Sequence, residues 1–325
     1  MTPRKPAKKA AKRTAKPTAA KRGAGAAGKR PVPRAKAAAV GRQAGPARTA
    51  APELRPLPVF EFTAGEIAGY LRLSDPDRGF EFCGAPGGRS LPTACKEVLS
   101  LRHYLARGNG GLLTPREEAD CQGNVDKNGI VFRYQPTAKW PVEATVRYEL
   151  LSQGGLDATF AFDFRKDLNG FEAGVETVVP RTYAGVHVHA GGRWVATAAG
   201  PRLKRFYPRN LGAAELIADG RWSGFRRAGI GLAVEPQGYD YPMVVVWETN
   251  GESAIAWMAL TEECSSVWVN GADRTIGMGL GGANVKSGSS CTCRLRVLLC
   301  RISQLDDVLP YYREFVQAAR SSRQR

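Results

Sequence analysis

The sequence predicts an all-β protein, built as a large antiparallel β-sandwich with a C-terminal helix and a disordered N-terminal tail. Many short apolar runs bounded by Gly, Pro, Asn or Asp follow residue 57, and several alternate apolar with polar residues. No amphipathic helical pattern separates these runs, which favours antiparallel sheets packed face to face over a parallel sheet. No repeat with a period of roughly 20 to 50 residues is present, which disfavours a propeller or a solenoid.

Residues 1–56 form the predicted tail and linker. Residues 1–50 contain 15 of the 47 Lys and Arg residues, no Asp or Glu, 16 Ala and 6 Pro. Most of the formal net charge of +17 therefore lies in this segment. With no aromatic residue and few large apolar ones, the segment cannot bury enough surface to offset the entropy of ordering, so we expect it to be disordered.

The tail resembles the tails of linker histones in composition. Its basic doublets are Lys8 and Lys9, Lys12 and Arg13, Lys21 and Arg22, and Lys29 and Arg30. A flexible cationic segment neutralises phosphates and releases counterions, so we expect non-specific contact with nucleic acid or another polyanion. Two other interpretations stay open. The tail is a solubilising extension, or it is an organelle transit peptide, although such peptides are rich in Ser and amphipathic.

The clearest strand pair of the predicted sandwich spans residues 142–151 and 156–165. Both segments alternate apolar with polar side chains, and Gly154 and Gly155 lie between them, which predicts a hairpin. The other predicted strands, in chain order, are 59–62, 70–73, 97–104, 130–134, 174–179, 183–190, 194–198, 229–235, 243–248, 254–260, 266–269, 274–278 and 292–302. We therefore expect the sandwich to span residues 57–302.

The C-terminal segment, residues 303–325, predicts a helix and a short tail. Ser303 and Asp306 have the spacing of a capping box, and the segment that begins at Pro310 places its apolar side chains on one face. We expect this helix to cover an edge or a face of a sheet.

The predicted hairpin resembles the central hairpin of the galactose-mutarotase-like, or aldose-epimerase-like, β-supersandwich. The resemblance rests on Trp140-Pro-Val-Glu-Ala-Thr-Val-Arg-Tyr-Glu-Leu-Leu, a Gly-Gly turn and Leu156-Asp-Ala-Thr-Phe-Ala-Phe, and it covers residues 130–190. It implies a large sandwich of antiparallel strands and a carbohydrate ligand. Aldose epimerases of this family follow the hairpin with a segment of Asn-His-Ser-Tyr type that carries a catalytic His, whereas this chain has His187-Val-His189 in that region.

His187 and His189 are candidate catalytic residues. Their spacing places both rings on one face of a predicted strand, where two imidazoles suit general acid/base chemistry on a sugar ring. The carboxylates that could complete such a site are Glu172, Glu176, Glu248, Glu262 and Glu263. We prefer Glu176 because it precedes the histidine strand. Two alternatives stay open, namely strand histidines without a ligand and the start of a metal site, although the Glu that a cupin-type metal site needs is missing near Arg193.

Basic and aromatic residues around and after the histidine strand are candidate substrate-binding residues. They are Arg181, Trp194, Arg205, Tyr207 and Trp222. Guanidinium groups bind carboxylates and phosphates, and aromatic faces pack on sugar rings, so an anionic sugar would suit both groups. The alternative is a solvated loop whose Trp residues pack in the core.

Several classes of protein have no support in the sequence. It contains no phosphate-binding or dinucleotide-binding Gly motif and no nucleophile elbow. We predict no metal, no cofactor, no membrane span and a cytoplasmic location with reduced thiols for the seven cysteines. The sequence does not decide whether the protein is an enzyme. The alternative to a carbohydrate-binding or carbohydrate-processing protein is a non-enzymatic scaffold or a nucleic-acid-associated protein whose sandwich binds another protein.

Overall fold

The computed structural model describes residues 59–65, 67–72, 80–84, 95–107, 109–113, 115, 121–126, 129–179, 183–197, 203–208, 232–248, 253–271 and 274–323. All of them belong to one unit of the chain, Arg55–Arg325. The predicted disordered tail and the candidate residues Arg181 and Trp222 lie outside the described residues.

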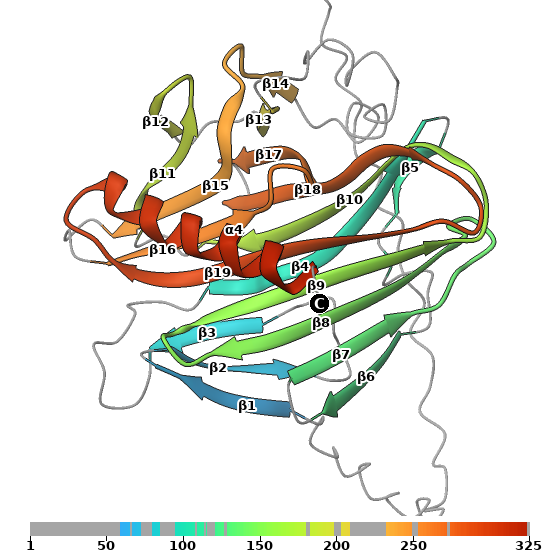
Figure 1. The fold of residues 1–325 in the computed structure, drawn as a ribbon, viewed down its shortest axis with the longest axis horizontal. Coiled ribbons are helices and arrows are strands. Elements are labelled where there is room, and N and C mark those ends of the chain that lie inside the picture. Colours follow the sequence, from blue (N-terminus) through green and yellow to red (C-terminus); the bar gives the residue numbers. More distant parts are fainter. Residues whose placement is uncertain are drawn as a thin grey trace, which may run out of the picture. The chain divides into compact units, whose positions relative to one another are not determined.

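One of two large β-sheets has ten strands (Figure 1). From one edge to the other it consists of β1 (Val59–Ala64), β2 (Ile67–Arg72), β3 (Phe80–Gly84), β4 (Cys95–Ala106), β10 (Leu168–Val178), β18 (Thr275–Val285), β17 (Cys264–Asn270), β13 (Leu203–Phe206) and β14 (Leu232–Val234), with β5 (Asn109–Leu113) paired to β4. Its neighbouring strands are antiparallel, except that β13 and β14 are parallel.

The second sheet has nine strands and is antiparallel throughout. It consists, in spatial order, of β12 (Arg193–Thr197), β11 (Tyr183–Ala190), β15 (Tyr239–Glu248), β16 (Ser253–Ala259), β19 (Ser290–Arg301), β9 (Gly155–Phe164), β8 (Val142–Leu151), β7 (Gly129–Tyr134) and β6 (Cys121–Asp126). The predicted hairpin is β8 and β9, paired from Val142 with Phe164 to Leu151 with Gly155. The predicted antiparallel β-sandwich is confirmed.

The main core lies between the facing sides of the two sheets. Alternate residues of β8 and β9 are buried, as the period of two predicts. Hydrogen bonds also cross the core. The Trp257 indole of β16 donates to Thr177 Oγ1 of β10 at 3.1 Å. The Tyr148 hydroxyl of β8 donates to the backbone oxygen of Leu99 in β4 at 2.9 Å. These bonds tie the second sheet to the strands that carry the candidate site.

The C-terminal segment folds as predicted into a helix, α4 (Leu309–Arg323), preceded by a 3-10 turn, η2 (Leu305–Val308). Figure 1 shows α4 crossing β19 obliquely. Its apolar side packs, through Tyr312, Phe315 and Ala319, on the face of the nine-stranded sheet that points away from the ten-stranded sheet, and Val308 of η2 joins the same cluster. Among the described residues, no helix has the length and apolar character needed to cross a membrane.

The predicted cap of this helix is wrong by one residue. Gln304 and Asp307, rather than Ser303 and Asp306, form the capping box. The backbone nitrogen and the hydroxyl of Ser303 both donate to Asp307 Oδ2, each at 2.8 Å. These bonds hold the pKa of Asp307 down at about 2. Asp306 instead accepts a hydrogen bond from the Trp194 indole at 2.8 Å. The shift arises because the 3-10 turn starts the helical segment at Leu305.

Four strands of the structure were not predicted from the sequence. They are β3, β5, β6 and β13. In β6, the side chains at 122, 124 and 125 are exposed, because this strand forms an edge of its sheet and buries neither face well. An edge strand of this kind pairs through its backbone, so its residues need not alternate.

Candidate functional site

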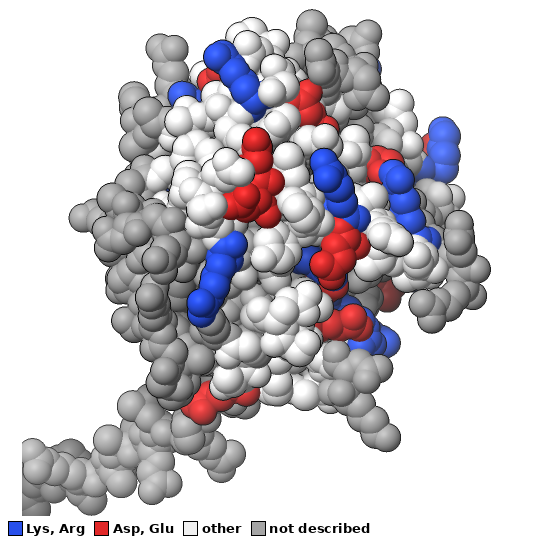
Figure 2. Space-filling model, turned by 60° about the vertical axis from the view of Figure 1, so that its left-hand side comes forward, with Lys and Arg blue, Asp and Glu red and all other residues white. Residues whose placement is uncertain are grey.

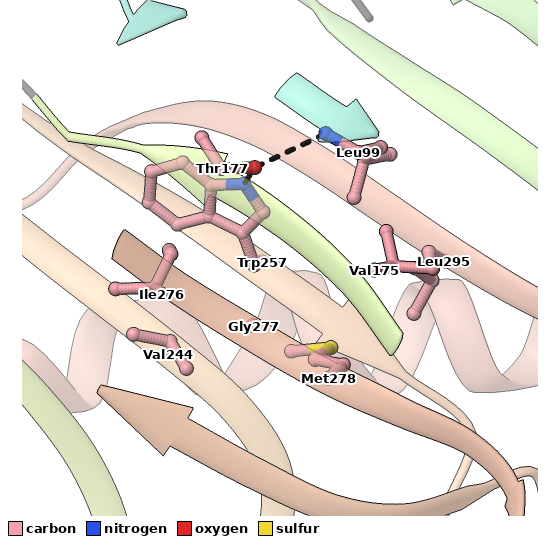
Figure 3. Close-up of a pocket in the computed structure, with 9 residues that line it drawn as sticks. All are labelled: Leu99, Val175, Thr177, Val244, Trp257, Ile276, Gly277, Met278 and Leu295. Atoms are coloured by element: carbon pink, nitrogen blue, oxygen red, sulfur yellow. Dashed lines mark hydrogen bonds between the residues drawn. The ribbon is translucent and has the colours of Figure 1, made fainter. Parts of the chain in front are cut away.

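The cavity between the two sheets is apolar and too small for an organic ligand. It is lined by Leu99, Val175, Thr177, Val244, Trp257, Ile276, Gly277, Met278 and Leu295 (Figure 3). Its volume is about 10 Å³, which holds a single water molecule at most. The Thr177 hydroxyl accepts hydrogen bonds from the Leu99 backbone nitrogen and the Trp257 indole, each at 3.1 Å. This cavity is therefore not a candidate ligand site.

Strand β10 places two carboxylates on the face of the ten-stranded sheet that points away from the other sheet. Phe171, Ala173 and Val175 belong to the core between the sheets. Because side chains alternate along a strand, Glu172 and Glu176 lie on the opposite face, which we call the outer face.

The register of five strands aligns polar, aromatic and glycine residues across this outer face. One row crosses β13, β17, β18 and β10 and consists of Arg205, Trp268, Gly277 and Glu176. The next row crosses β17, β18, β10 and β4 and consists of Ser266, Gly279, Gly174 and His103. We call His103, Glu172, Glu176, Arg205 and Trp268 the polar cluster.

Two glycines leave room for the rings of the polar cluster. A Cβ atom at Gly277 would overlap the Trp268 indole, and a Cβ atom at Gly174 would overlap the His103 imidazole. The two rings therefore occupy the space above the bare backbone, and their centroids lie 5.7 Å apart. Glycine is required here for close approach rather than for an unusual backbone conformation.

Glu172 and Arg205 form an ion pair at one end of the polar cluster. Nη1 of Arg205 lies 3.2 Å from Oε1 of Glu172, and both side chains are 0% exposed. The hydroxyls of Ser265 and Ser266 donate to Oε2 and Oε1 of the same carboxylate, at 3.0 and 3.3 Å. The Arg205 guanidinium also lies 4.5 Å from the centre of the Trp268 ring. Two buried charges require this degree of pairing, so we assign this end a structural role.

Glu176 lies at the opposite, more open end of the polar cluster. Its Oε2 is 3.7 Å from Nε of Arg102, and Nη1 of Arg102 is 3.4 Å from Oε2 of Glu97. The exposed side-chain fractions are 17% for Glu176, 32% for Arg102 and 28% for Glu97. Burial raises the pKa of Glu176, and Arg102 and Trp268 partly offset that effect. Glu176 is thus a carboxyl that keeps its proton more readily than an exposed one and still reaches solvent.

His103 is a neutral group at physiological pH. Burial is the largest cause that lowers its pKa to about 3, and the positive charges of Arg205 and Arg102 act in the same direction. Its imidazole therefore contributes polarity but no charge to the polar cluster.

The polar cluster contains three of the candidate residues that the sequence analysis named, Glu172, Glu176 and Arg205. Tyr207 follows β13 and is buried, and its backbone oxygen accepts a hydrogen bond from the Tyr239 nitrogen at 2.7 Å. No sequence spacing indicated which of these residues share a face, because their strands are far apart in the chain.

His187 and His189 lie on β11 in the nine-stranded sheet, so the structure does not bring them together with Glu176. Nδ1 of His189 is 3.0 Å from Oδ2 of Asp240. The His189 ring contacts Trp194 and Tyr241, with centroids 5.2 and 5.1 Å away. Burial lowers the pKa of His187. Both histidines and Trp194 belong to the sheet face that α4 covers, and their proposed roles toward a sugar stay predictions.

The sequence reasoning missed His103, Trp268 and Arg102. The sequence did contain a signal for this site. Glu172, Gly174 and Glu176 are spaced by two, which places a glycine between two carboxylates on one face of the strand. Gly277 and Gly279 repeat the same spacing in β18. Alternating glycines mark a strand surface that another group approaches closely.

Among the residues that the structure describes, no set of side chains forms a metal site. No group of three or more His, Cys, Asp or Glu side chains lies close enough there to hold an ion.

No family model and no curated protein match the sequence. Solved structures similar to this chain include a candidate aldose 1-epimerase from Escherichia coli K12, with 10% identity and a TM-score of 0.43 over 75% of this chain and 99% of that one. A galactose mutarotase-related enzyme from Lactobacillus acidophilus has 11% identity and a TM-score of 0.40, over 74% of this chain and 97% of that one.

An α-N-acetylgalactosaminidase from Bifidobacterium bifidum has 13% identity and a TM-score of 0.49 over 80% of this chain, which spans only 39% of that enzyme. The large antiparallel sheets that the resemblance to galactose-mutarotase-like proteins implied are present in the structure. The fold and the site together define a β-sandwich protein with a polar cluster on the outer face of its larger sheet.

Proposed function

We propose that the protein binds or processes a carbohydrate and that an uncharged sugar ring contacts Arg102 and Glu176. The observation that carries the proposal is the partly exposed Glu176 carboxyl, which has a raised pKa and lies beside a guanidinium group. A carboxylate accepts and a guanidinium donates hydrogen bonds, so the pair matches the neighbouring hydroxyl groups of a sugar.

Glu176 is the group through which a proton would be exchanged. A carboxyl with a raised pKa gains and loses a proton closer to neutral pH, which suits general acid/base catalysis. Glycoside hydrolysis usually needs two carboxyl groups at the scissile bond, and Glu172 is fully buried and bound by Arg205. One accessible carboxyl therefore suits the ring opening of an aldose better than hydrolysis. In that step the Glu176 carboxylate would take the proton of the anomeric hydroxyl while the bond between the anomeric carbon and the ring oxygen breaks, and water would supply the proton that the ring oxygen gains.

The charge at this end of the polar cluster favours a neutral sugar over the anionic sugar expected from the sequence. Arg102 lies between Glu97 and Glu176, so two carboxylates offset its single positive charge. An added anion would meet little net attraction there.

Titration with neutral and anionic sugars tests this proposal. Galactose and glucose should give a saturable change in Trp fluorescence, and glucuronate a weaker one. Glu176→Gln should abolish any acceleration of mutarotation in polarimetry and weaken binding. It should fold normally, because Gln has nearly the same size as Glu and burial disfavours the Glu176 charge. Glu143→Gln, which changes a carboxyl of β8 paired with Arg165, is the matched control. Absence of saturable binding by either neutral sugar would overturn the proposal.

A second role concerns the basic tail, for which we propose non-specific polyanion binding. Residues 1–50 hold 15 Lys and Arg residues and no acidic residue. On the face shown in Figure 2, by contrast, basic side chains of the described residues lie among acidic ones. That mixture favours the tail over this face as the polyanion-binding part.

A further inference from the structure

A pocket of about 420 Å³ lies between helix α4 and strand β15. Most of its lining is formed by Tyr241 of β15 and by Tyr312, Arg313, Gln317 and Arg320 of α4. Its volume lies within the range of small-molecule sites, roughly 300 to 1,000 Å³. It shares no lining residue with the polar cluster, which belongs to the other sheet.

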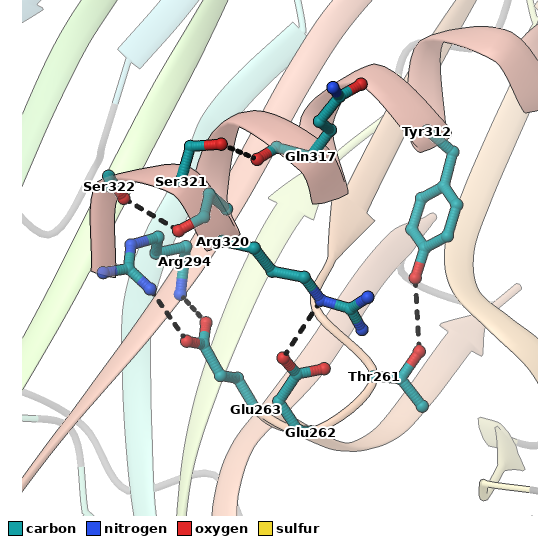
Figure 4. A network of polar contacts seen from close by, with 10 residues as sticks. Thr261, Glu262, Glu263, Arg294, Tyr312, Gln317, Arg320, Ser321 and Ser322 are labelled. Carbon is teal, nitrogen blue, oxygen red and sulfur yellow. Dashed lines mark hydrogen bonds and ion pairs between the residues drawn. The ribbon is translucent and has the colours of Figure 1, made fainter. Parts of the chain in front are cut away.

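Two tyrosine rings form the aromatic part of this pocket. The centroids of Tyr241 and Tyr312 lie 5.3 Å apart, with the rings tilted by 55°. Their neighbours hold both rings in place, because His189 contacts Tyr241 and the hydroxyls of Tyr312 and Thr261 are 3.2 Å apart (Figure 4). Fixed aromatic faces are suited to packing against the C–H surface of a ring compound.

Two arginines supply the charge of the pocket. Arg313 and Arg320 are seven residues apart, about 10.5 Å along the helix axis, so they lie on one side of α4. Among the described residues that line the pocket, none is acidic. Arg320 Nε is 4.0 Å from Glu262 Oε1, and the Arg320 side chain is 64% exposed. Figure 4 shows its terminal nitrogens on the side of Tyr312. An exposed pair at this distance is weak, so Arg320 can exchange it for an anion in the pocket.

We infer that this pocket binds a small ring compound that carries a carboxylate or phosphate group, such as a hexuronate or a hexose phosphate. The ring packs against the partly exposed Tyr241, whose ring the buried Tyr312 supports. The anionic group lies between Arg313 and Arg320, which bind it through charge-assisted hydrogen bonds. The Gln317 amide both donates and accepts, so it matches a ring hydroxyl. This anion site is independent of the sugar contact proposed at Arg102 and Glu176.

Calorimetric titration of the full chain tests the inference with four probes: glucuronate, glucose 6-phosphate, methyl glucoside and inorganic phosphate. In the Glu176→Gln chain, which lacks the neutral-sugar contact proposed at the polar cluster, at least one of the two anionic sugars should bind more tightly than methyl glucoside and than phosphate. The double variant Arg313→Ala/Arg320→Ala should weaken that binding by about tenfold or more, because each arginine contributes a hydrogen bond to a charged group.

Matched variants separate this pocket from the polar cluster and from net charge. Arg133→Ala/Arg193→Ala removes two exposed arginines from β7 and β12 and should leave anionic-sugar binding unchanged. Glu176→Gln should also leave it unchanged. Tyr241→Phe should retain binding, whereas Tyr241→Ala should lose it, because only the ring is needed.

Three results would overturn the inference. The first is that neither anionic sugar binds the wild-type chain. The second is that phosphate or methyl glucoside binds the Glu176→Gln chain as tightly as the anionic sugars do. The third is that the two double variants change affinity equally.

Discussion

The indole ring of Trp268 occupies the space above Gly277 that a Cβ atom would fill. Gly277 also lines the small cavity on the opposite side of the sheet. At Gly277, therefore, only the backbone separates the apolar core from the polar cluster. A side chain at this position must displace the Trp268 indole.

Gly277→Ala should lower the free energy of unfolding by about 1 to 3 kcal/mol, the usual cost of overpacking a core. It should also change the near-UV circular dichroism, because Trp268 must move. Urea denaturation measures the first effect. Ala283→Ser, an exposed position of the same strand, should leave both quantities nearly unchanged. Equal behaviour of the two variants would contradict the close packing of Trp268 on Gly277.

Glu172→Ala should destabilise the protein by about 3 to 5 kcal/mol, because it leaves the buried Arg205 charge without its carboxylate. The control is Glu143→Ala, whose partner Arg165 is exposed, so the loss should stay below about 1 kcal/mol. The double variant Glu172→Leu/Arg205→Met should recover much of the loss, since it removes both charges. Denaturant unfolding compares the three, and equal costs for the two single variants would refute the structural role of Glu172.

Stability should depend on pH through His103. Its folded-state pKa of about 3 lies below the ordinary value of 6.5. Between these values the unfolded chain binds more protons than the folded chain, so stability falls as the pH falls from 6.5 toward 3. A single site contributes a slope of about 1.4 kcal/mol per pH unit. Urea denaturation from pH 7 to pH 4 should show this slope in the wild type, reduced by that amount in His103→Gln. Identical slopes would place His103 in a solvated environment.

Removal of residues 1–50 should abolish binding to duplex DNA, RNA and heparin at low salt. If 6 to 10 charges contact the polyanion, the affinity of the full chain should fall by roughly 10³ to 10⁵ between 50 and 200 mM salt. Since the segment contains no aromatic residue, single strands should gain nothing from base stacking. Filter binding at two salt concentrations compares the two chains. Unchanged binding after truncation would leave the tail a solubilising extension.

The sequence could predict strands that bury one face and expose the other. It could not predict which strands, far apart in the chain, are neighbours in a sheet. The alternation in β8 and β9 follows from burial of one face, and both were predicted almost to the residue. Glu176 was preferred because it precedes the histidine strand, and it was grouped with His187 and His189; its role as a base stays a prediction. Spacing within one strand reports which side chains share a face. It cannot report that β10 lies beside β4 and β18 while β11 belongs to the other sheet.

Helix α4 covers its sheet from the end of the described chain, and that position has a consequence for biosynthesis. The apolar face that it covers includes Met243, Val245 and Met258, from strands β15 and β16. A ribosome releases those strands before it has made α4, so the growing chain exposes this face while translation continues. Exposed apolar sheet surface is a frequent start of aggregation. A nascent chain arrested before residue 309 should therefore be captured by chaperones, whereas one that has extruded α4 should escape them.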